Sequence, residues 1–303
     1  MAVEARFWGT RGSIPSPGPH TVRHGGNTSC VEVRTPDGGS VILDAGTGIR
    51  SLATARAATA AGATDNSGTD NDGTAPGRET DIFITHAHWD HIQGLPFFAP
   101  LYDGACHVRI WTAPTLLARV ERALRSQMAP DVFPVPFEEV RATVEFLPVP
   151  EDGTTVGGLS IATFPLRHPG GAVGFRVSGC NEGEGTLVYI PDNELYPGAP
   201  YDAPPEWRSW LVRFIHGADL LIHDAMYTAA EYPSVVGWGH STVDEAVELA
   251  AEAGVPKLML FHHHPERHDD AMDEMVELAR ESCGRLGGNV EIAVATEGAR
   301  IRL

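Results

Sequence analysis

Short runs in which apolar and β-branched residues dominate recur along the chain and predict β-strands. Other stretches place apolar residues at i, i+3 and i+4, which predicts helices that bury one stripe. The predicted strands cover residues 30–35, 40–46, 81–86, 107–112, 159–164, 172–177, 185–190, 257–262 and 290–295, and the predicted helices cover 113–127, 241–254 and 269–284. Strands crowd the first half and alternate with helices later, so the pattern predicts sheets covered by helices on their outer faces.

One stretch breaks this pattern. Residues 57–80 are small, polar and almost free of large apolar side chains. Such a segment buries too little to repay the entropy of ordering, and this composition predicts a flexible surface insertion. Because it lies between two strands of one sheet pattern, it does not mark a domain boundary, and we expect a single domain over residues 1–303.

Acidic residues outnumber basic ones, which limits the class of partner. The chain has 22 Lys and Arg against 40 Asp and Glu, a formal net charge of −18. An average surface of this charge repels polyanions, so extended binding to nucleic acid is disfavoured. A small anion can still bind beside a metal ion, because distant charges are screened over a Debye length of about 8 Å.

The chain shows no membrane signal and no disulfide framework. No apolar run approaches the roughly 20 residues of a membrane span, and the first residues lack a basic region followed by a long apolar stretch. We therefore expect a cytoplasmic protein. The four cysteines are widely separated and predict buried thiols; they are Cys30, Cys106, Cys180 and Cys283.

The stretch FITHAHWDHIQG places three histidines and an aspartate in six positions after an apolar run. Side chains alternate along an extended segment, so His86 and His88 point the same way and can hold one ion. If the chain then turns into a helix, Asp90 and His91 lie in its first turn and can serve a second ion. Imidazole and carboxylate suit zinc, while manganese and iron stay open.

Three further candidate ligands follow other predicted strands: His168, Asp192 and His262. Strand ends gather at one edge of a sheet, so we expect these residues beside the histidine cluster. Asp192 could bridge two ions, whereas His168 and His262 could each complete one. The seven residues together predict a site for two divalent metal ions, with Zn²⁺ favoured.

The segment THAHWDH resembles the HxHxDH signature of the metallo-β-lactamase superfamily. The similarity extends over most of the chain, since VILDAGTGIR, His168, YIPDNELY and LFHHHP resemble the first, third, fourth and last motifs of that family. FWGTRGSIPSPG, RHGGNTSCVEV and HWDHIQGLPFF look most like its phosphoribosyl cyclic phosphodiesterase-like branch, which is related to ribonuclease Z. This resemblance implies an αββα sandwich with two metal ions at the sheet edge.

The resemblance also implies which residues hold each ion. The first ion would be held by His86, His88 and His168, the second by Asp90, His91 and His262, and both by Asp192, while Asp44 would orient a ligand without touching the metal. The last ligand depends on the end of its strand, because a shift by one residue would turn His263 or His264 inward instead. Alignment with the family pattern favours His262.

GWGHSTVDEA resembles a segment of the ribonuclease Z-like branch in which a histidine stands beside the scissile phosphate, and this implies such a role for His240. Ser241 or Thr242 could instead only cap the next helix with Glu245, although both roles can hold at once. LLIHDAMY resembles a strand and acidic turn of that branch, so Asp224 either orients His240 or simply packs. The glycine turns GTRGS and GTG are weak evidence for phosphate binding.

These features predict a metal-dependent hydrolase, specifically a phosphodiesterase acting on a small phosphodiester, with cyclic and acyclic substrates both left open. Asp90 would take or steer the proton of the attacking water, and His240 as imidazolium would protonate the leaving oxygen. The expected partner is a small molecule rather than nucleic acid or a membrane, and a homodimer is left open.

Three alternatives use the same residues. A ribonuclease Z-like endonuclease acting on transfer RNA precursors is the nearest, but the acidic balance and the lack of an evident basic, glycine-rich arm count against it. Thioester or lactone hydrolysis would use the same metals, and fold resemblance does not choose between them. A noncatalytic metal-binding interaction module would be expected to have lost ligands, whereas this chain retains seven candidates.

Overall fold

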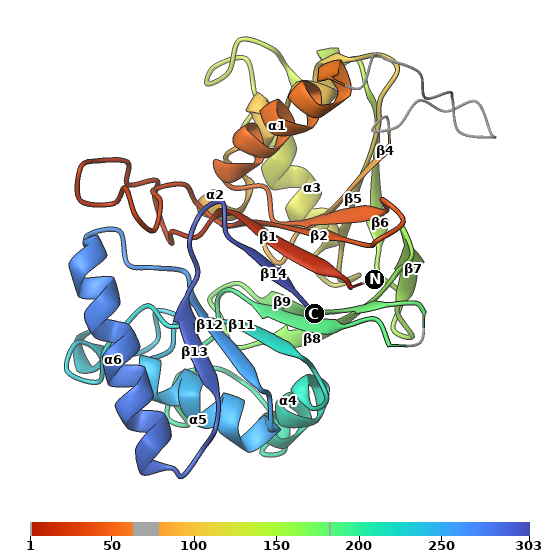
Figure 1. The fold of residues 1–303 in the computed structure, drawn as a ribbon. Coiled ribbons are helices and arrows are strands. Elements are labelled where there is room, and N and C mark those ends of the chain that lie inside the picture. The colour runs from red at the N-terminus through yellow and green to blue at the C-terminus, as the bar shows by residue number, and fades with distance from the viewer. Residues whose placement is uncertain (1, 63–78, 182) are drawn as a thin grey trace.

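The computed structural model describes residues 2–62, 79–181 and 183–303. In this part of the chain, two seven-stranded sheets pack face to face and helices cover both outer faces, as Figure 1 shows. The helices on the first sheet are α1 (Gly48–Gly62) and α3 (Leu117–Ser126), and those on the second are α4 (Trp207–Ile215), α5 (Val243–Ala253) and α6 (Asp269–Arg285). The predicted αββα sandwich is confirmed.

The first sheet combines an antiparallel and a parallel half. Its strands, in spatial order, are β14 (Arg300–Arg302), β1 (Glu4–Gly9), β2 (Cys30–Arg34), β3 (Ser40–Leu43), β4 (Glu79–Phe83), β5 (His107–Thr112) and β6 (Thr143–Pro148). The pairs from β14 to β3 are antiparallel, and those from β3 to β6 are parallel. Asp44 and the histidine stretch therefore both follow the carboxyl ends of neighbouring parallel strands, β3 and β4.

The second sheet has the same mixed character. Its strands, in spatial order, are β13 (Glu291–Val294), β12 (Lys257–Phe261), β11 (Leu220–Asp224), β10 (Thr186–Ile190), β9 (Ala172–Gly179), β8 (Leu159–Leu166) and β7 (Thr154–Val156). The strands from β13 to β10 are parallel, and β8 runs in the same direction because β9 is antiparallel to both β8 and β10. The residues that follow β8, β10, β11 and β12 consequently emerge at one edge.

Aromatic side chains pack between the two sheets and fix their separation. Phe7 lies against Phe261 with ring centres 6.2 Å apart, and Phe83 meets Phe175 edge-on at 5.6 Å. Tyr189 packs edge-on against Phe261 at 5.5 Å. These fully buried rings join strands from both sheets, so the two edges that carry the candidate ligands are held in register by close packing.

The sequence pattern found most of the long elements but missed helix α1 and several short elements. β1, β6, β7, β11 and β14 lie outside the strands predicted from the pattern, and α1 and α4 lie outside the predicted helices. The helix expected to hold Asp90 and His91 in its first turn is a single turn: α2 (Trp89–Ile92) ends before Gly94, and 3₁₀ turns at Leu95–Phe97 and Ala99–Tyr102 follow. Prolines at the starts of both 3₁₀ turns explain why an α-helix does not continue. Two other 3₁₀ turns lie at Phe137–Glu139 and Tyr232–Ser234.

The insertion expected over residues 57–80 is wrong at both ends. Helix α1 continues to Gly62, and β4 begins at Glu79, with Thr80 already buried. The sequence after residue 56 lacks an apolar stripe, but it is rich in alanine, which has the highest intrinsic helix propensity, and this explains why the helix continues to Gly62. The remainder of the expected insertion, residues 63–78, lies outside the described residues.

Two other expectations concern cysteines and membranes. Cys30, Cys106 and Cys283 are buried as predicted, but Cys180 is exposed, because it lies just beyond the end of β9. None of the helices in residues 2–62, 79–181 and 183–303 combines the length and apolar character needed to cross a membrane.

Helix α6 offers a test of how its apolar stripe stabilises the fold. Met275 is 1% exposed in the core under the second sheet, whereas Leu278, one turn away, is 48% exposed. We expect Met275→Ala to lower the free energy of unfolding by about 2–5 kcal/mol, because it leaves a cavity. Leu278→Ala should change it by no more than about 0.5 kcal/mol. Urea denaturation at matched metal content measures both, and equal losses would contradict the predicted core stripe.

Candidate metal centre

Four of the predicted ligands form a first group at the shared edge of the two sheets. His86 and His88 follow β4, while His168 follows β8 and Asp192 follows β10. One ligand atom from each lies within 4.8 Å of those of the others. His88 Nδ1 is 2.8 Å from His168 Nε2, and Asp192 Oδ2 is 3.5 Å from that same nitrogen. The first group thus draws its side chains from both sheets.

The other three predicted ligands form a second group beside the first. Asp90 and His91 belong to α2, and His262 follows β12. His262 Nε2 lies 3.0 Å from Asp90 Oδ2 and 3.3 Å from His91 Nε2. Asp192 Oδ1 is 2.9 Å from His91 Nε2 and 3.3 Å from His262 Nε2, so this carboxylate lies between the two groups.

The three consecutive histidines after β12 have different surroundings. His262 turns inward to the second group, where its backbone has a φ of 57°. His263 points away and its Nε2 donates to the carbonyl oxygen of Ala295 at 2.8 Å. His264 packs against the ring of Tyr227. The geometry therefore favours His262, as the alignment did.

Hydrogen bonds fix the orientation of two of the imidazoles. His91 Nδ1 donates to Asp44 Oδ2 at 2.8 Å, and His168 Nδ1 donates to the carbonyl oxygen of Gly239 at 2.9 Å. Asp44 also accepts hydrogen bonds from the Thr85 backbone and hydroxyl and from the Tyr189 hydroxyl. With Nδ1 protonated in each ring, Nε2 of the neutral form carries a lone pair directed into the cluster.

The donor set fits a metal ion. His86 Nε2 and Asp192 Oδ1 are fully buried and have no hydrogen-bond partner among the described residues, although both face the cluster. Burial lowers the pKa of His168 to about 3 and that of His86 well below its usual value, so both rings are neutral near pH 7. Neutral, inward-facing imidazole nitrogens beside a buried carboxylate are what divalent zinc, manganese or iron requires.

The charges of the cluster also attract a cation. Burial alone would raise the pKa of Asp192, but the surrounding imidazoles, first His262 and then His91, lower it well below its usual value. Burial alone would lower the pKa of His91, yet Asp192, Asp90 and Asp44 together raise it well above. The same carboxylates that favour a proton on His91 would favour a metal cation at this position.

His240 and Asp224 form a pair next to both groups. Asp224 ends β11 and accepts a hydrogen bond from His240 Nδ1 at 2.8 Å. Burial opposes charge on this ring, but Asp224 by charge and hydrogen bond, then Asp192 and Asp90, raise the pKa of His240 to about 9. The neighbouring Thr242 caps α5 through a complete capping box with Glu245, which confirms the capping role expected for this segment. An ordered cap fixes the backbone from which His240 projects.

Glu194 is a functional candidate that sequence reasoning missed. Its fully buried carboxylate accepts hydrogen bonds from the backbone of Gly237 at 2.8 Å and of Gly239 at 2.7 Å, and from the hydroxyls of Tyr201 and Tyr232. Gly239 in turn accepts from His168 and precedes His240 in the chain. The available signal was its position two residues after Asp192 in PDNELY, which alone does not reveal partners more than forty residues away.

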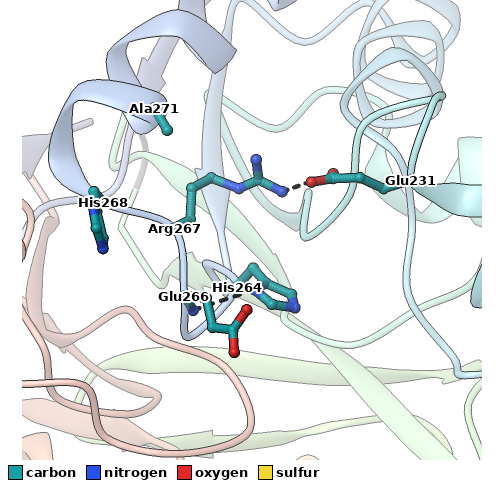
Figure 2. A pocket seen from close by; sticks show the side chains of 6 residues that line it. All are labelled: Glu231, His264, Glu266, Arg267, His268 and Ala271. Carbon is teal, nitrogen blue, oxygen red and sulfur yellow. Dashed lines mark hydrogen bonds and ion pairs between the residues drawn. The ribbon is translucent and has the colours of Figure 1, made fainter.

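A hollow lies beside the ligand groups rather than at them. Its volume is about 300 Å³, and Figure 2 shows that it lies where the segment after His262 meets the start of α6. Arg267 in its wall donates to Glu231 at 2.8 Å. The residues that line it are Glu231, His264, Glu266, Arg267, His268 and Ala271, none of which belongs to the two ligand groups.

Comparisons with known proteins agree with this architecture. A family model described as "Beta-lactamase superfamily domain" matches residues 41–263. The ribonuclease Z of Bacillus cereus (strain B4264) is 24% identical over 259 residues, which covers 72% of this chain and 80% of that protein.

Two solved structures have a similar fold. The metallo-β-lactamase fold protein YhfI from Bacillus subtilis aligns over 99% of both chains with a TM-score of 0.68 and 18% identity. A diphosphatase from the PhnP family aligns over 99% of this chain and 98% of its own, with a TM-score of 0.65 and 19% identity. At these identities the structural matches show the fold alone.

The contacts of Glu194 generate a prediction about the segment before His240. Glu194→Gln replaces one carboxylate oxygen by an amide NH₂, which cannot accept a hydrogen bond. The backbone N–H of Gly237 or Gly239 is then left without an acceptor, which lowers the stability of this segment by about 1–3 kcal/mol. We expect faster amide hydrogen exchange in the peptide that contains Gly237 and Gly239. Tyr232→Phe, which removes one hydroxyl donor to Glu194 and spares its backbone contacts with Gly237 and Gly239, is the matched control with a smaller effect. Unchanged exchange in that peptide of Glu194→Gln would show that the carboxylate does not hold it.

Proposed function

The chain belongs to the beta-lactamase superfamily, and we propose that it is a dinuclear metal-dependent hydrolase acting on a small phosphodiester. The observation that carries the proposal is the position of His240. Its ring centre lies 5.3 Å from that of His168 in the first ligand group and 5.0 Å from that of His262 in the second. A proton donor beside two metal positions is the combination that cleavage of a phosphate ester with a poor leaving group requires.

Seven residues would hold two divalent ions, most simply Zn²⁺ given the imidazole and carboxylate donors. The first ion would be held by His86, His88 and His168, the second by Asp90, His91 and His262, and Asp192 would reach both. When bound, such ions withdraw negative charge from the phosphate oxygens and activate water near neutral pH. Asp44 and Gly239 would keep His91 and His168 in the tautomer that leaves Nε2 free.

The protein groups around these ions would move the protons. Asp90, whose Oδ2 also accepts the Ser13 backbone N–H at 2.7 Å, would steer the proton of the attacking water. His240 would donate a proton from Nε2 to the leaving oxygen, since its Nδ1–H is engaged by Asp224. Asp224 is itself held by the backbone N–H groups of Asn193 and Met226, so the pair has a fixed direction.

The substrate class follows from charge and from the proton donor. A net charge of −18 disfavours a long polyanion, whereas a small phosphodiester requires only the local positive charge of the ions. Thioesters and lactones could use the same ions. A thiolate leaving group, however, needs little protonation, so the buried His240–Asp224 pair favours an alkoxide leaving group over a thiolate. Phosphate esters and lactones both have such a leaving group, and the substrate panel below separates them.

RNA processing is the second candidate function, because relatives such as the Bacillus cereus protein are named ribonuclease Z. A noncatalytic metal-binding module is a third, and the presence of all seven candidate ligands in two compact groups counts against it. Turnover of a substrate panel separates these candidates. The panel contains cyclic nucleotides, cyclic ribose phosphates, a chromogenic phosphodiester, a thioester, a lactone and a transfer RNA precursor. Preferred cleavage of the RNA would replace the small-substrate proposal.

The proposal predicts two metal ions per chain. Seven candidate ligands exceed the four that one tetrahedral ion uses, and Asp192 lies between the groups. Elemental analysis of protein purified without chelator should give a content near two, or reach two after zinc is added back. A content that stays near one would exclude the dinuclear mechanism.

A second prediction isolates the role of His240. His240→Ala should retain both ions and the fold but lose kcat, typically by about 10²- to 10⁴-fold for general acid–base groups. The loss should depend on the leaving group: an acidic phenol hardly needs a proton and should recover much of the rate, whereas a sugar alkoxide should stay slow. Parallel kinetics on the two substrates measure this dependence.

His88→Ala is the control for that experiment. By removing a ligand of the first group, it should slow both substrates and reduce metal content. Because His240 also lies within 4.8 Å of ligand atoms of Asp192 and His262, a ligand role is the competing interpretation. Metal loss in His240→Ala, or equal slowing of both substrates, would support that interpretation and reject the proton donor.

A further inference from the structure

The N-terminal segment that contains the GTRGS turn lies against one ligand group and not the other. It leaves β1 at Gly9 and passes beside the residues that follow β12. We infer that residues 10–13 are a positioning element that sets the affinity of the second ligand group for its ion. The inference rests on the proposed function, since it concerns the metal position formed by Asp90, His91 and His262.

Backbone pairing ties this segment to the residue after His262. Gly12 N donates to the carbonyl oxygen of His263, and His263 N donates to that of Thr10, both at 3.0 Å. These two bonds enclose the turn at which His262 adopts its φ of 57°, a conformation that costs a non-glycine residue about 1–3 kcal/mol. The N-terminal segment therefore stabilises the backbone conformation that directs the His262 ring inward.

Direct contacts from the same segment reach both ends of the second group. A Cβ on Gly12 would collide with Nδ1 and Cε1 of the His262 ring, so only glycine permits the ring to lie where it does. Ser13 N donates to Asp90 Oδ2 at 2.7 Å, and Ser13 itself has a φ of 61°. Two of the three second-group ligands are thus held by adjacent residues of one turn.

The buried side chain of Arg11 holds this turn in place through hydrogen bonds to neighbouring backbone segments. This side chain is fully buried, and its guanidinium donates to three backbone carbonyl oxygens: Gly25 at 2.8 Å, His264 at 3.2 Å and Arg267 at 2.6 Å. The residues His264 and Arg267 belong to the segment that follows His262 and lines the hollow in Figure 2. A buried guanidinium that bridges these carbonyls fixes the chain on both sides of the N-terminal turn.

The hydrogen bonds and the Gly12 contact of this turn involve the second group alone. They reach Asp90, His262 and the backbone after His262, whereas the first group is held by Gly239, Thr85 and its own members. Loss of the turn should therefore weaken one metal position and spare the other. Groups that orient metal ligands typically contribute roughly 10- to 100-fold in metal affinity.

The test is stepwise metal loading of Gly12→Ala and Arg11→Lys. Each variant is equilibrated with buffered free Zn²⁺, metal per chain is determined by elemental analysis, and the fold is checked by circular dichroism. We expect one ion to bind as in the wild-type protein, while the dissociation constant of the other rises by roughly 10- to 100-fold. Arg11→Lys keeps the positive charge but cannot donate to all three carbonyl oxygens. It provides the test of the inference if Gly12→Ala fails to fold.

Two matched controls exist in the same N-terminal stretch. Gly18 has open space around its Cα, and Arg23 is a half-exposed arginine that pairs with Asp270 and Asp273 on α6. Gly18→Ala and Arg23→Met should both load two ions normally. Normal loading of both ions by folded Arg11→Lys and Gly12→Ala, or equal weakening of the two positions, would overturn the inference. A wild-type protein that binds fewer than two ions would instead overturn the proposed function itself.

Discussion

Six buried side chains and the partly buried His88 direct lone pairs and negative charge at one another at the shared sheet edge, and a bound cation would make this arrangement favourable. His91 and His168 use Nδ1 to donate outward, to Asp44 and to Gly239, so their Nε2 atoms face inward as acceptors. Asp192 brings a carboxylate to the same place with one oxygen unpaired. In a low-dielectric interior, unpaired acceptors cost several kcal/mol, and a divalent ion removes that cost for many atoms at once.

Backbone strain is concentrated at the same place. Among the residues that the structure describes, the non-glycine residues with positive φ are Ser13, Asp44 and His262, and each touches the ligand groups. Each conformation costs about 1–3 kcal/mol and persists only where surrounding contacts over-determine it. Here those contacts are the parallel strands that precede Asp44 and His262, the inter-sheet aromatic packing, and the hydrogen bonds of the N-terminal turn.

The sequence predicts those site residues whose positions follow from local strand patterns. It does not predict those whose roles depend on contacts between distant parts of the chain. Alternation after an apolar strand predicted that His86 and His88 share a direction, and the strand ends predicted His168, Asp192 and His262 as neighbours, because both are short-range regularities. Glu194 could not be recognised, since its partners lie seven to forty-five residues away and a lone Glu after a strand is common. The sequence around Arg11 and Gly12 predicts no more than a glycine turn, because nothing in GTRGS indicates that residue 263 pairs with it.

The two ligand groups share a feature that links the site to the stability of the whole fold. Each combines residues that follow β4 of the first sheet with residues that follow strands of the second: His168 and Asp192 in one group, His262 in the other. An ion held by either group would therefore join the two sheets at their edge. Because these ligands come together only when the sheets pack, such an ion would bind the native state far better than the unfolded chain, and its binding energy would add to the free energy of unfolding. The aromatic packing between the sheets and the binding of ions at their edge would then stabilise one another. The packing brings the ligands together, and the bound ions would hold the two sheet edges together.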